Sequence, residues 1–116
     1  MRRELCEAEA ELCRTLGDPT RLGIVLSLAD GPLCVTDLCG RLDAPQSTIS
    51  RHLKILRDRM LVRATRDAQH VQYSLGDRHL LKVVDGLRRY LASTGAAGRR
   101  PVSGGGAGGV REVEEP

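Results

Sequence analysis

The segment Leu33–Leu56 decides the fold, and it reads LCVTDLCGRLDAPQSTISRHLKIL within a chain of 116 residues. Its second half predicts a helix with one buried face, because apolar residues recur there at helical spacing: Ile49, Leu53 and Leu56. A second short helix is expected over residues 36–42, and Asp43-Ala44-Pro45 separates the two helices. Two short helices joined by a tight turn predict a helix-turn-helix unit.

Further elements are predicted on both sides of this unit. An amphipathic helix over residues 2–16 ends at Gly17, and a largely apolar helix follows over 19–28. Downstream, alternating residues predict a β-hairpin with strands at 61–65 and 69–75 and a turn at 66–68, followed by a helix that Asp77 caps. The expected fold class is therefore mainly α with a β-hairpin wing, a winged helix-turn-helix of order α-α-α-α-β-β-α.

Composition divides the chain into two parts. Residues 1–94 are predicted to form one DNA-binding and dimerisation domain, whereas residues 95–116 are rich in Gly and are expected to be a disordered tail. With no Trp or Phe and only two Tyr, the core must be built from Leu, Val and Ile. A core of this size predicts a homodimer, because a second copy covers apolar surface that one core leaves exposed.

Positive charge is concentrated just after the helix-turn-helix. Between Arg51 and Arg66 there are six basic residues and one acid, Asp58, although the net charge of the whole chain is only +3. Alone, such a segment would be interpreted as a solvated charged face. Next to a helix-turn-helix, it favours binding to the phosphate backbone of DNA.

The N-terminal residues and the cysteines indicate a compartment. Acids rather than an apolar run follow Met1-Arg2-Arg3-Glu4-Leu5, and no stretch is long enough to span a bilayer, so we expect a cytoplasmic protein without a membrane partner. The four cysteines should then stay reduced, which favours ligand or redox roles over disulfides.

Three motifs in order connect the chain to a known family. They are Leu16-Gly17-Asp18-Pro19-Thr20-Arg21-Leu22, Leu33-Cys34-Val35-Thr36-Asp37-Leu38-Cys39 and Ile49-Ser50-Arg51-His52-Leu53. From about Leu5 to Tyr90 the sequence resembles the ArsR/SmtB family of winged-helix, metal-responsive repressors, and it looks most like the arsenic-sensing branch. The resemblance implies a transcriptional repressor, not an enzyme, that leaves its operator when a thiophilic ion binds cysteine thiolates.

The helix in the second half of the opening segment is expected to enter the major groove of double-stranded operator DNA, and a two-fold dimer would match an inverted repeat. Arg51 is expected to read a guanine, with a phosphate contact as the alternative, and His52 is expected to pack or to touch phosphate. The residues predicted to contact DNA are Gln46, Ser47, Thr48, Ser50, Arg51, His52, Lys54, Arg66 and His70, with Arg63 and Gln69 as further candidates. The dimer interface is predicted at Leu5, Leu12, Leu80, Val84, Leu87 and Leu91.

The cysteines are the candidate sensor. Cys34 and Cys39 match two of three thiol positions that hold As(III) or Sb(III) in the resembling arsenic sensors, and Thr36 occupies the middle position. Residues five apart in an unbroken helix point about 140° apart, so Cys34 must lie outside the helix, or the helix must distort, before both can bind one ion. Cys6 or Cys13 is a candidate third ligand, although a core role is favoured for Cys13. Cd(II), Pb(II) or Zn(II) is the alternative inducer.

Other functions were weighed against this one. A thiol-redox or sulfur-species switch at Cys34 and Cys39 would use the same fold. A small thiol enzyme is disfavoured, because the chain has no Cys-x-x-Cys pair and no Gly-rich phosphate loop, and an interaction module with core cysteines ranks above it. Asp77-Arg78-His79 matches only the opening of the site found in zinc-type relatives, since Tyr90 and Ser93 stand at the later positions.

Overall fold

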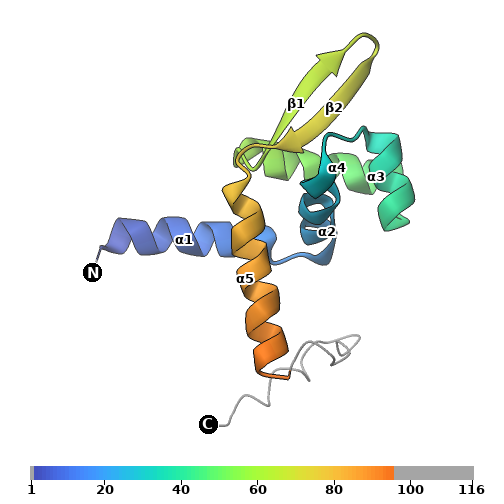
Figure 1. Ribbon diagram of the computed structural model, residues 1–116. Helices are drawn as coiled ribbons and strands as arrows, with labels where there is room; N and C mark the ends of the chain where they lie inside the picture. Colours follow the sequence, from blue (N-terminus) through green and yellow to red (C-terminus); the bar gives the residue numbers. More distant parts are fainter. Residues whose placement is uncertain (1, 96–116) are drawn as a thin grey trace. The chain divides into compact units, whose positions relative to one another are not determined.

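The computed structural model describes residues 2–95. Along the chain lie α1 (Arg3–Leu16), α2 (Pro19–Ser27), a 3-10 turn (Leu28–Asp30), α3 (Val35–Leu42), α4 (Gln46–Asp58), β1 (Val62–Asp67), β2 (His70–Leu75) and α5 (His79–Ser93) (Figure 1). This order confirms the predicted winged helix-turn-helix. The described part of the chain divides into two units between Lys82 and Val83. The Gly-rich tail predicted to be disordered lies outside the described residues, apart from its first residue.

The junction between α1 and α2 is built from local hydrogen bonds. The backbone N–H of Gly17 donates to Arg14 O at 3.2 Å and ends α1. Asp18 then caps α2, because its Oδ1 accepts from the backbone N–H groups of Thr20 at 2.8 Å and Arg21 at 3.2 Å. Pro19 occupies the first turn, where its missing N–H leaves no hydrogen bond unmade.

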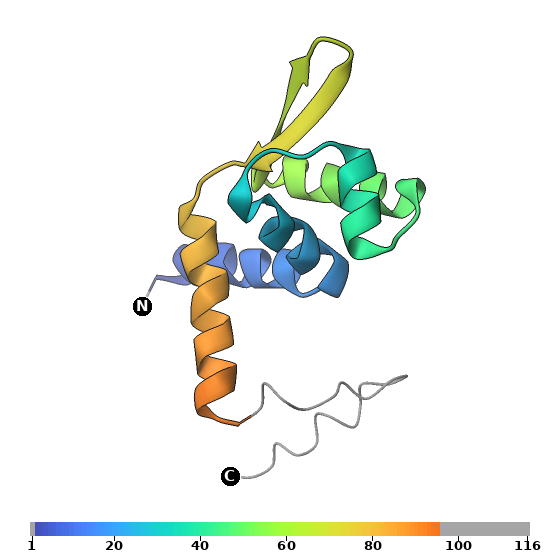
Figure 2. The ribbon, with the colours of Figure 1, turned by 45° about the vertical axis from the view of Figure 1, so that its right-hand side comes forward.

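The core lies where α2, α3 and α4 pack together. Its largest fully buried side chains are Ile24, Val25, Leu28, Leu38, Ile49, Leu53 and Leu56. The helices α2 and α3 approach closely at Gly23, where an added Cβ would lie 2.8 Å from Cδ2 of Leu42. The helices α3 and α4 of the helix-turn-helix therefore both pack against α2. They lie side by side in both views of the ribbon (Figures 1 and 2).

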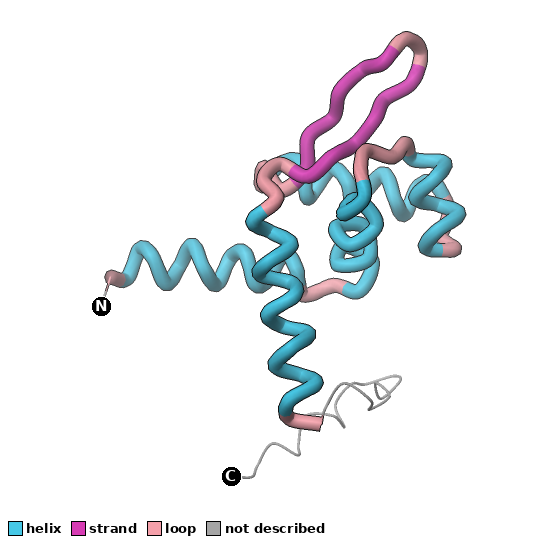
Figure 3. Tube along the Cα trace, in the orientation of Figure 1, coloured by secondary structure: helices cyan, strands magenta, loops and turns pink. Residues whose placement is uncertain are grey.

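The hairpin is antiparallel and its turn is shorter than predicted. The strands pair from Val62 with Leu75 to Asp67 with His70, so only Ala68 and Gln69 remain in the turn (Figure 3). The prediction of a turn at residues 66–68 is therefore wrong, because Arg66 and Asp67 continue the strand. A two-residue turn suits the twist of paired strands, and the φ of 59° at Ala68 is typical of such turns.

A third segment joins the hairpin, which the sequence did not predict. Leu33 forms an antiparallel bridge with Tyr73, with N···O distances of 3.0 and 2.8 Å. This bridge attaches the chain just before α3 to β2, which is therefore the inner strand of the hairpin. The entry to the helix-turn-helix and the wing are consequently one hydrogen-bonded structure.

The helix α5 begins as predicted. Asp77 Oδ1 accepts from the backbone N–H of His79 at 2.8 Å and caps the first turn.

In the part of the chain that the structure describes, no helix is long and apolar enough to cross a membrane.

Candidate nucleic-acid interface and thiol site

The first two turns of α4 carry an exposed polar face. The predicted contact residues Gln46, Ser47, Ser50, Arg51 and Lys54 are exposed, and Thr48 is half-buried. The opposite face of the same helix is buried in the core, so α4 cannot turn these side chains inward without exposing its apolar stripe. The helix therefore presents donors and positive charge to the outside, as a groove-reading helix requires.

His52 differs from the rest of the predicted contact set. Its side chain is buried, with 6% of its surface exposed, and its Nδ1 lies 3.1 Å from Nη1 of Arg21 on α2. The same guanidinium donates through Nε to the backbone oxygen of Thr15 at 2.5 Å. Arg21 therefore joins the end of α1 to the middle of α4.

A second link joins α1 to the end of α4. Glu11 accepts from Arg14 at 2.7 Å and also forms an ion pair with Arg59, the residue that follows α4. Sequence reasoning missed both links, because helical periodicity reports which face is buried and carries no signal for polar partners 31 residues apart, as Arg21 and His52 are.

The charges around this junction act on one another. Burial lowers the pKa of His52 below its ordinary value of 6.5, the neighbouring Asp18 carboxylate raises it, and Arg51 and Arg21 lower it further. Burial alone would raise the pKa of Asp18, but its hydrogen bonds from Arg21 and Thr20 outweigh that effect and lower the pKa. His52 is therefore neutral and Asp18 charged at neutral pH.

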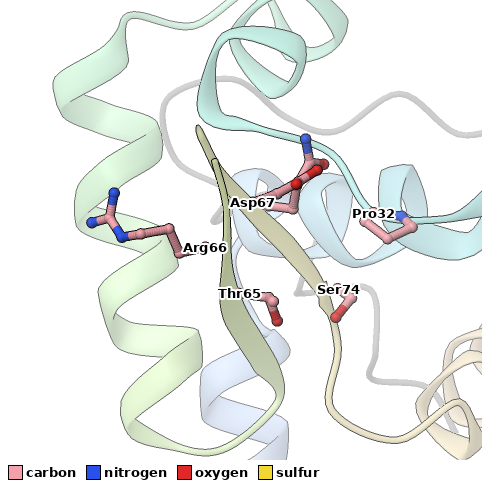
Figure 4. Close-up of a pocket in the computed structure, with 6 residues that line it drawn as sticks. Pro32, Thr65, Arg66, Asp67 and Ser74 are labelled. Carbon is pink, nitrogen blue, oxygen red and sulfur yellow. The ribbon is translucent and has the colours of Figure 1, made fainter. Parts of the chain in front are cut away.

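The hairpin carries the remaining predicted contacts. Arg63, Arg66, Gln69 and His70 are all exposed, and Arg63 is anchored by a 3.0 Å hydrogen bond from its Nη2 to Gly76 O. Successive side chains of a strand point to opposite faces, so Arg66 lies opposite Thr65. Figure 4 shows the Arg66 side chain pointing away from the other labelled residues.

The polar face of the hairpin borders a cavity of about 560 Å³. Its lining residues are Pro32, Thr65, Arg66, Asp67, Gln72 and Ser74 (Figure 4). A smaller cavity of about 270 Å³ lies between α4 and β2, where Ser50, Lys54 and Arg57 approach Tyr73. The basic residues of α4 and the inner strand of the hairpin thus share one concave surface.

The four cysteines fall into two pairs. Cys34 is the N-cap of α3 with an extended backbone (φ −91°, ψ 173°), so it lies outside the helix. Its backbone N and its Sγ lie 3.3 and 3.2 Å from Oδ2 of Asp37. Cys39 is half-buried within α3, whereas Cys6 and Cys13 are exposed on α1. The core role favoured for Cys13 is therefore wrong for the single chain. No disulfide joins them, and residues 2–95 contain no group of three or more His, Cys, Asp or Glu side chains placed to hold a metal ion.

Comparison with known proteins identifies the class of this fold. The model of the bacterial regulatory protein arsR family matches residues 18–64, which run from the α2 cap through β1. The solution structure of apo-NmtR superposes with a TM-score of 0.70 at 31% identity, covering 90% of this chain and 89% of that one. The chain belongs to the ArsR family.

Among curated ArsR-family relatives, the chain is 42% identical over 82 residues to the HTH-type transcriptional repressor SmtB of Mycobacterium tuberculosis, covering 71% of this chain and 61% of that one. It is 48% identical over 66 residues to the arsenical resistance operon repressor of Escherichia coli K12, covering 56% of each. The chain therefore spans less than two thirds of the length of these two relatives. Because the family consists of transcriptional regulators, the prediction that this is not an enzyme is confirmed.

The second site considered in the sequence is a local pair. Nδ1 of His79 lies 2.9 Å from Oδ1 of Asp77, and both side chains are exposed. Hydrogen bonds from the backbone and the ring of His79 lower the pKa of Asp77. In this ArsR-family chain the two residues start a helix, and the interpretation of Asp77 as a helix cap is confirmed.

The residues predicted for a dimer interface differ in exposure. Leu80 and Val84 are 7% and 2% exposed in the single chain, and Leu12 is half-buried. Leu5, Leu87 and Leu91 are 52%, 49% and 44% exposed. On α5, the exposed apolar residues Val83, Leu87, Tyr90 and Leu91 recur at helical spacing and form one stripe.

Proposed function

We propose that this chain binds operator DNA as a homodimer in the cytoplasm and releases it when a thiophilic ion binds Cys34 and Cys39. As(III) or Sb(III) is the expected inducer, and Cd(II), Pb(II) or Zn(II) is the alternative. The observation that carries the proposal is the place of Cys34, which caps the first helix of the helix-turn-helix. The name of the E. coli relative, an arsenical resistance operon repressor, supports the choice of ion.

DNA binding is supported by the exposed polar face of α4 and by the basic hairpin beside it. Insertion of α4 into the major groove brings Gln46, Ser47 and Arg51 to the base edges, with Arg51 suited to guanine. Arg66 and His70 of the hairpin would contact the neighbouring backbone. Two copies related by a two-fold axis would contact half-sites about 34–36 Å apart, or a multiple of that distance.

Ion binding would disturb α3 at its N-cap. Thiols bind soft ions as thiolates, so Cys34 would give up its proton and lose the hydrogen bond from Sγ to Asp37. Cys39 lies five residues further, inside the helix. Bringing both sulfur atoms to one ion therefore requires the first turn of α3, or the segment before it, to move.

A movement of α3 would reach the reading helix through packing. The inner face of α3, with Leu38 fully buried, packs on α2 and α4, and Gly23 and Leu42 are already in close contact. Dense interiors transmit such displacements instead of absorbing them. A coupling free energy of about 1–3 kcal/mol would lower operator affinity roughly 5- to 150-fold.

A third thiolate is expected to complete the site. Trivalent arsenic readily takes three sulfur ligands, and residues 2–95 of one chain do not place a third candidate beside Cys34 and Cys39. Cys6 or Cys13, exposed on α1, could supply it from the same chain or from the second protomer.

The test is a DNA-release titration. The intact chain first selects a duplex from a random-sequence pool, and fluorescence anisotropy then follows release of that duplex by arsenite, antimonite, Cd(II), Pb(II) or Zn(II) under phosphine reductant. We expect arsenite to release the duplex from the wild type but not from Cys34→Ser or Cys39→Ser. Cys6→Ser and Cys13→Ser identify the third ligand, because only its loss weakens the response.

Two results would contradict the proposal. Selection of no duplex would remove DNA binding. Retention of the duplex with every ion, together with release by peroxide or persulfide, would replace the ion with a thiol-redox switch at the same two cysteines.

A further inference from the structure

We propose that Arg21 and His52 are positioning residues for DNA binding: the Arg21 guanidinium holds the neutral His52 imidazole and fixes α4 against the α1–α2 junction, and protonation of His52 breaks this contact and weakens operator binding. The inference rests on the proposed function, because it requires α4 to enter DNA. It adds a role for Arg21, which the predicted contact set does not contain, and makes the role of His52 indirect.

The geometry of the pair determines where the imidazole proton lies. A guanidinium has only N–H donors and no acceptor, so the 3.1 Å contact between Nη1 of Arg21 and Nδ1 of His52 requires Nδ1 to accept. The proton of the neutral ring must then be on Nε2. A protonated ring carries hydrogen on both nitrogens, so it cannot accept from Arg21 and places two cations in contact.

Arg21 cannot easily turn away from a charged ring, because its other donors are engaged. Nε donates to Thr15 O at 2.5 Å, and Nη2 lies 3.5 Å from Arg14 O. Both are carbonyl groups of the last turn of α1, where a cation is favoured, and Arg14 O also accepts from the backbone N–H of Gly17. Protonation would therefore displace His52 rather than Arg21.

Displacement of His52 changes the orientation of the reading face. His52 is 6% exposed and stands in the sequence between Arg51, which is exposed, and Leu53, which is 1% exposed. Because α4 is a continuous helix from Gln46 to Asp58, a rotation that brings the imidazolium to water rotates Arg51 and Lys54 by the same angle. The side chains that enter the groove would lose their alignment with it.

The charges facing the ring favour the neutral form at neutral pH. Asp18, from the cap of α2, favours the imidazolium, whereas Arg21 on α2 and Arg51 on α4 oppose it, and burial opposes it most strongly. The switch therefore operates below the ordinary histidine pKa of 6.5.

The expected change of operator affinity on acidification is opposite to the change that added positive charge alone would cause. Acidification raises the net positive charge of a protein, and added positive charge strengthens binding to phosphates. A loss of operator affinity on acidification therefore distinguishes the Arg21–His52 contact from a general charge effect.

The first experiment examines the wild-type chain without DNA. Nitrogen-15 NMR of the labelled imidazoles at neutral pH should show His52 with a proton on Nε2 and none on Nδ1, and a titration should place its pKa below 6.5. A proton on Nδ1 at neutral pH would overturn the proposal, because the ring could not then accept from Arg21.

The second experiment measures affinity for the selected duplex between about pH 7.5 and about pH 5.5. We expect the wild type to lose about tenfold in affinity on acidification. His52→Asn offers a carbonyl acceptor that does not titrate, so it should bind at neutral pH and lose the acid response. Arg21→Met should bind weakly at both ends of the range, and the control His79→Gln should keep the wild-type profile.

The outcomes separate this inference from the proposed function. An unchanged acid response in His52→Asn, or wild-type affinity in Arg21→Met, would overturn the positioning role while DNA binding stands. Failure of the intact chain to select any duplex would overturn both. Circular dichroism of each variant shows whether it is folded. If a variant is unfolded, the NMR result for the wild type decides whether Nδ1 of His52 accepts from Arg21.

Discussion

The backbone of Gly76 packs directly against the carbonyl oxygen of Met60, so that a side chain at position 76 has no room. The N–H of Gly76 also donates to Leu61 O at 2.8 Å, which closes the base of the hairpin where β1 begins and β2 has ended. A Cβ at this position would contact backbone atoms of Met60 and Leu61, which cannot move as a flexible side chain can. The wing is thereby joined to the end of α4.

Gly76→Ala is expected to destabilise the chain by about 2 kcal/mol or more, because the backbone must shift at the base of the wing. The control is Gly40→Ala on α3, where nothing lies within 4 Å of the added Cβ, and where alanine should stabilise the helix by about 1 kcal/mol. Urea unfolding measures both free energies. If the two substitutions changed the free energy of unfolding equally, the two glycines would not be distinguished by their surroundings.

The chain is expected to be less stable with Met60 than with glycine at the same position. It has a φ of 64° and is 81% exposed, so it bears the cost of a left-handed backbone with little packing in return. Met60→Gly should raise the free energy of unfolding by about 1 kcal/mol, whereas Met60→Ala, which keeps the Cβ, should change it little. A loss of stability in Met60→Gly would mean that the methionine side chain makes a stabilising contact.

The fold was predictable from sequence because each element has a periodic apolar face and a clear boundary. Asp18 and Pro19 mark the start of α2, and the stripe of Ile49, Leu53 and Leu56 marks the buried face of α4. The hairpin turn was placed too early, because strand alternation does not reveal which residues pair. Register is set by cross-strand pairs such as Arg66 with Val71, which become visible only in the folded chain.

The candidate site was less predictable than the fold. Exposure of the α4 polar face follows from its apolar stripe. The spacing of Cys34 and Cys39 places Cys34 outside the helix only if both bind one ion, so it does not by itself predict the N-cap position. The burial of His52 also follows helical spacing, since it neighbours Leu53 and Leu56, but its partner Arg21 lies on another helix. Long-range polar pairs of this kind leave no periodic signal in one sequence.

Asp18 is expected to give the chain a pH-dependent stability below its ordinary pKa of 3.8. Because the folded state lowers this pKa, the contribution is present above 3.8 and is lost as the pH falls through the folded value. Asp18→Ala should cost about 1 kcal/mol at neutral pH through loss of the α2 cap. Asp18→Asn should keep most of the cap and remove this part of the acid dependence, as followed by urea unfolding between pH 2 and pH 5. Identical acid profiles for wild type and Asp18→Asn would contradict the assignment.

Substitutions of Arg51 and Lys54 are expected to weaken operator binding in different ways. Removing one phosphate contact should reduce the slope of log affinity against log salt by about 0.9, which is the effect expected for Lys54→Ala. Arg51→Ala should also relax discrimination at one base pair if it reads guanine, at a cost of about 1–3 kcal/mol. Arg3→Ala, an exposed arginine on α1 paired with Glu7, is the charge-matched control. Anisotropy at several salt concentrations and with point-substituted duplexes separates the two roles, and a flat salt response in the wild type would contradict groove binding.

The stripe on α5 is expected to hold the dimer together. Leu87 and Leu91 are about half exposed in the single chain and lie one helical turn apart, so charge placed there would face apolar surface on the second copy. Leu87→Asp with Leu91→Asp should give a monomer by sedimentation equilibrium and lower operator affinity, because each half-site contact would then form independently. Lys82→Asp, an exposed residue on the same helix, is the control and should remain dimeric. A dimer that persists in the double variant would place the interface elsewhere, and the exposed Leu5 on α1 would then be the next residue to substitute.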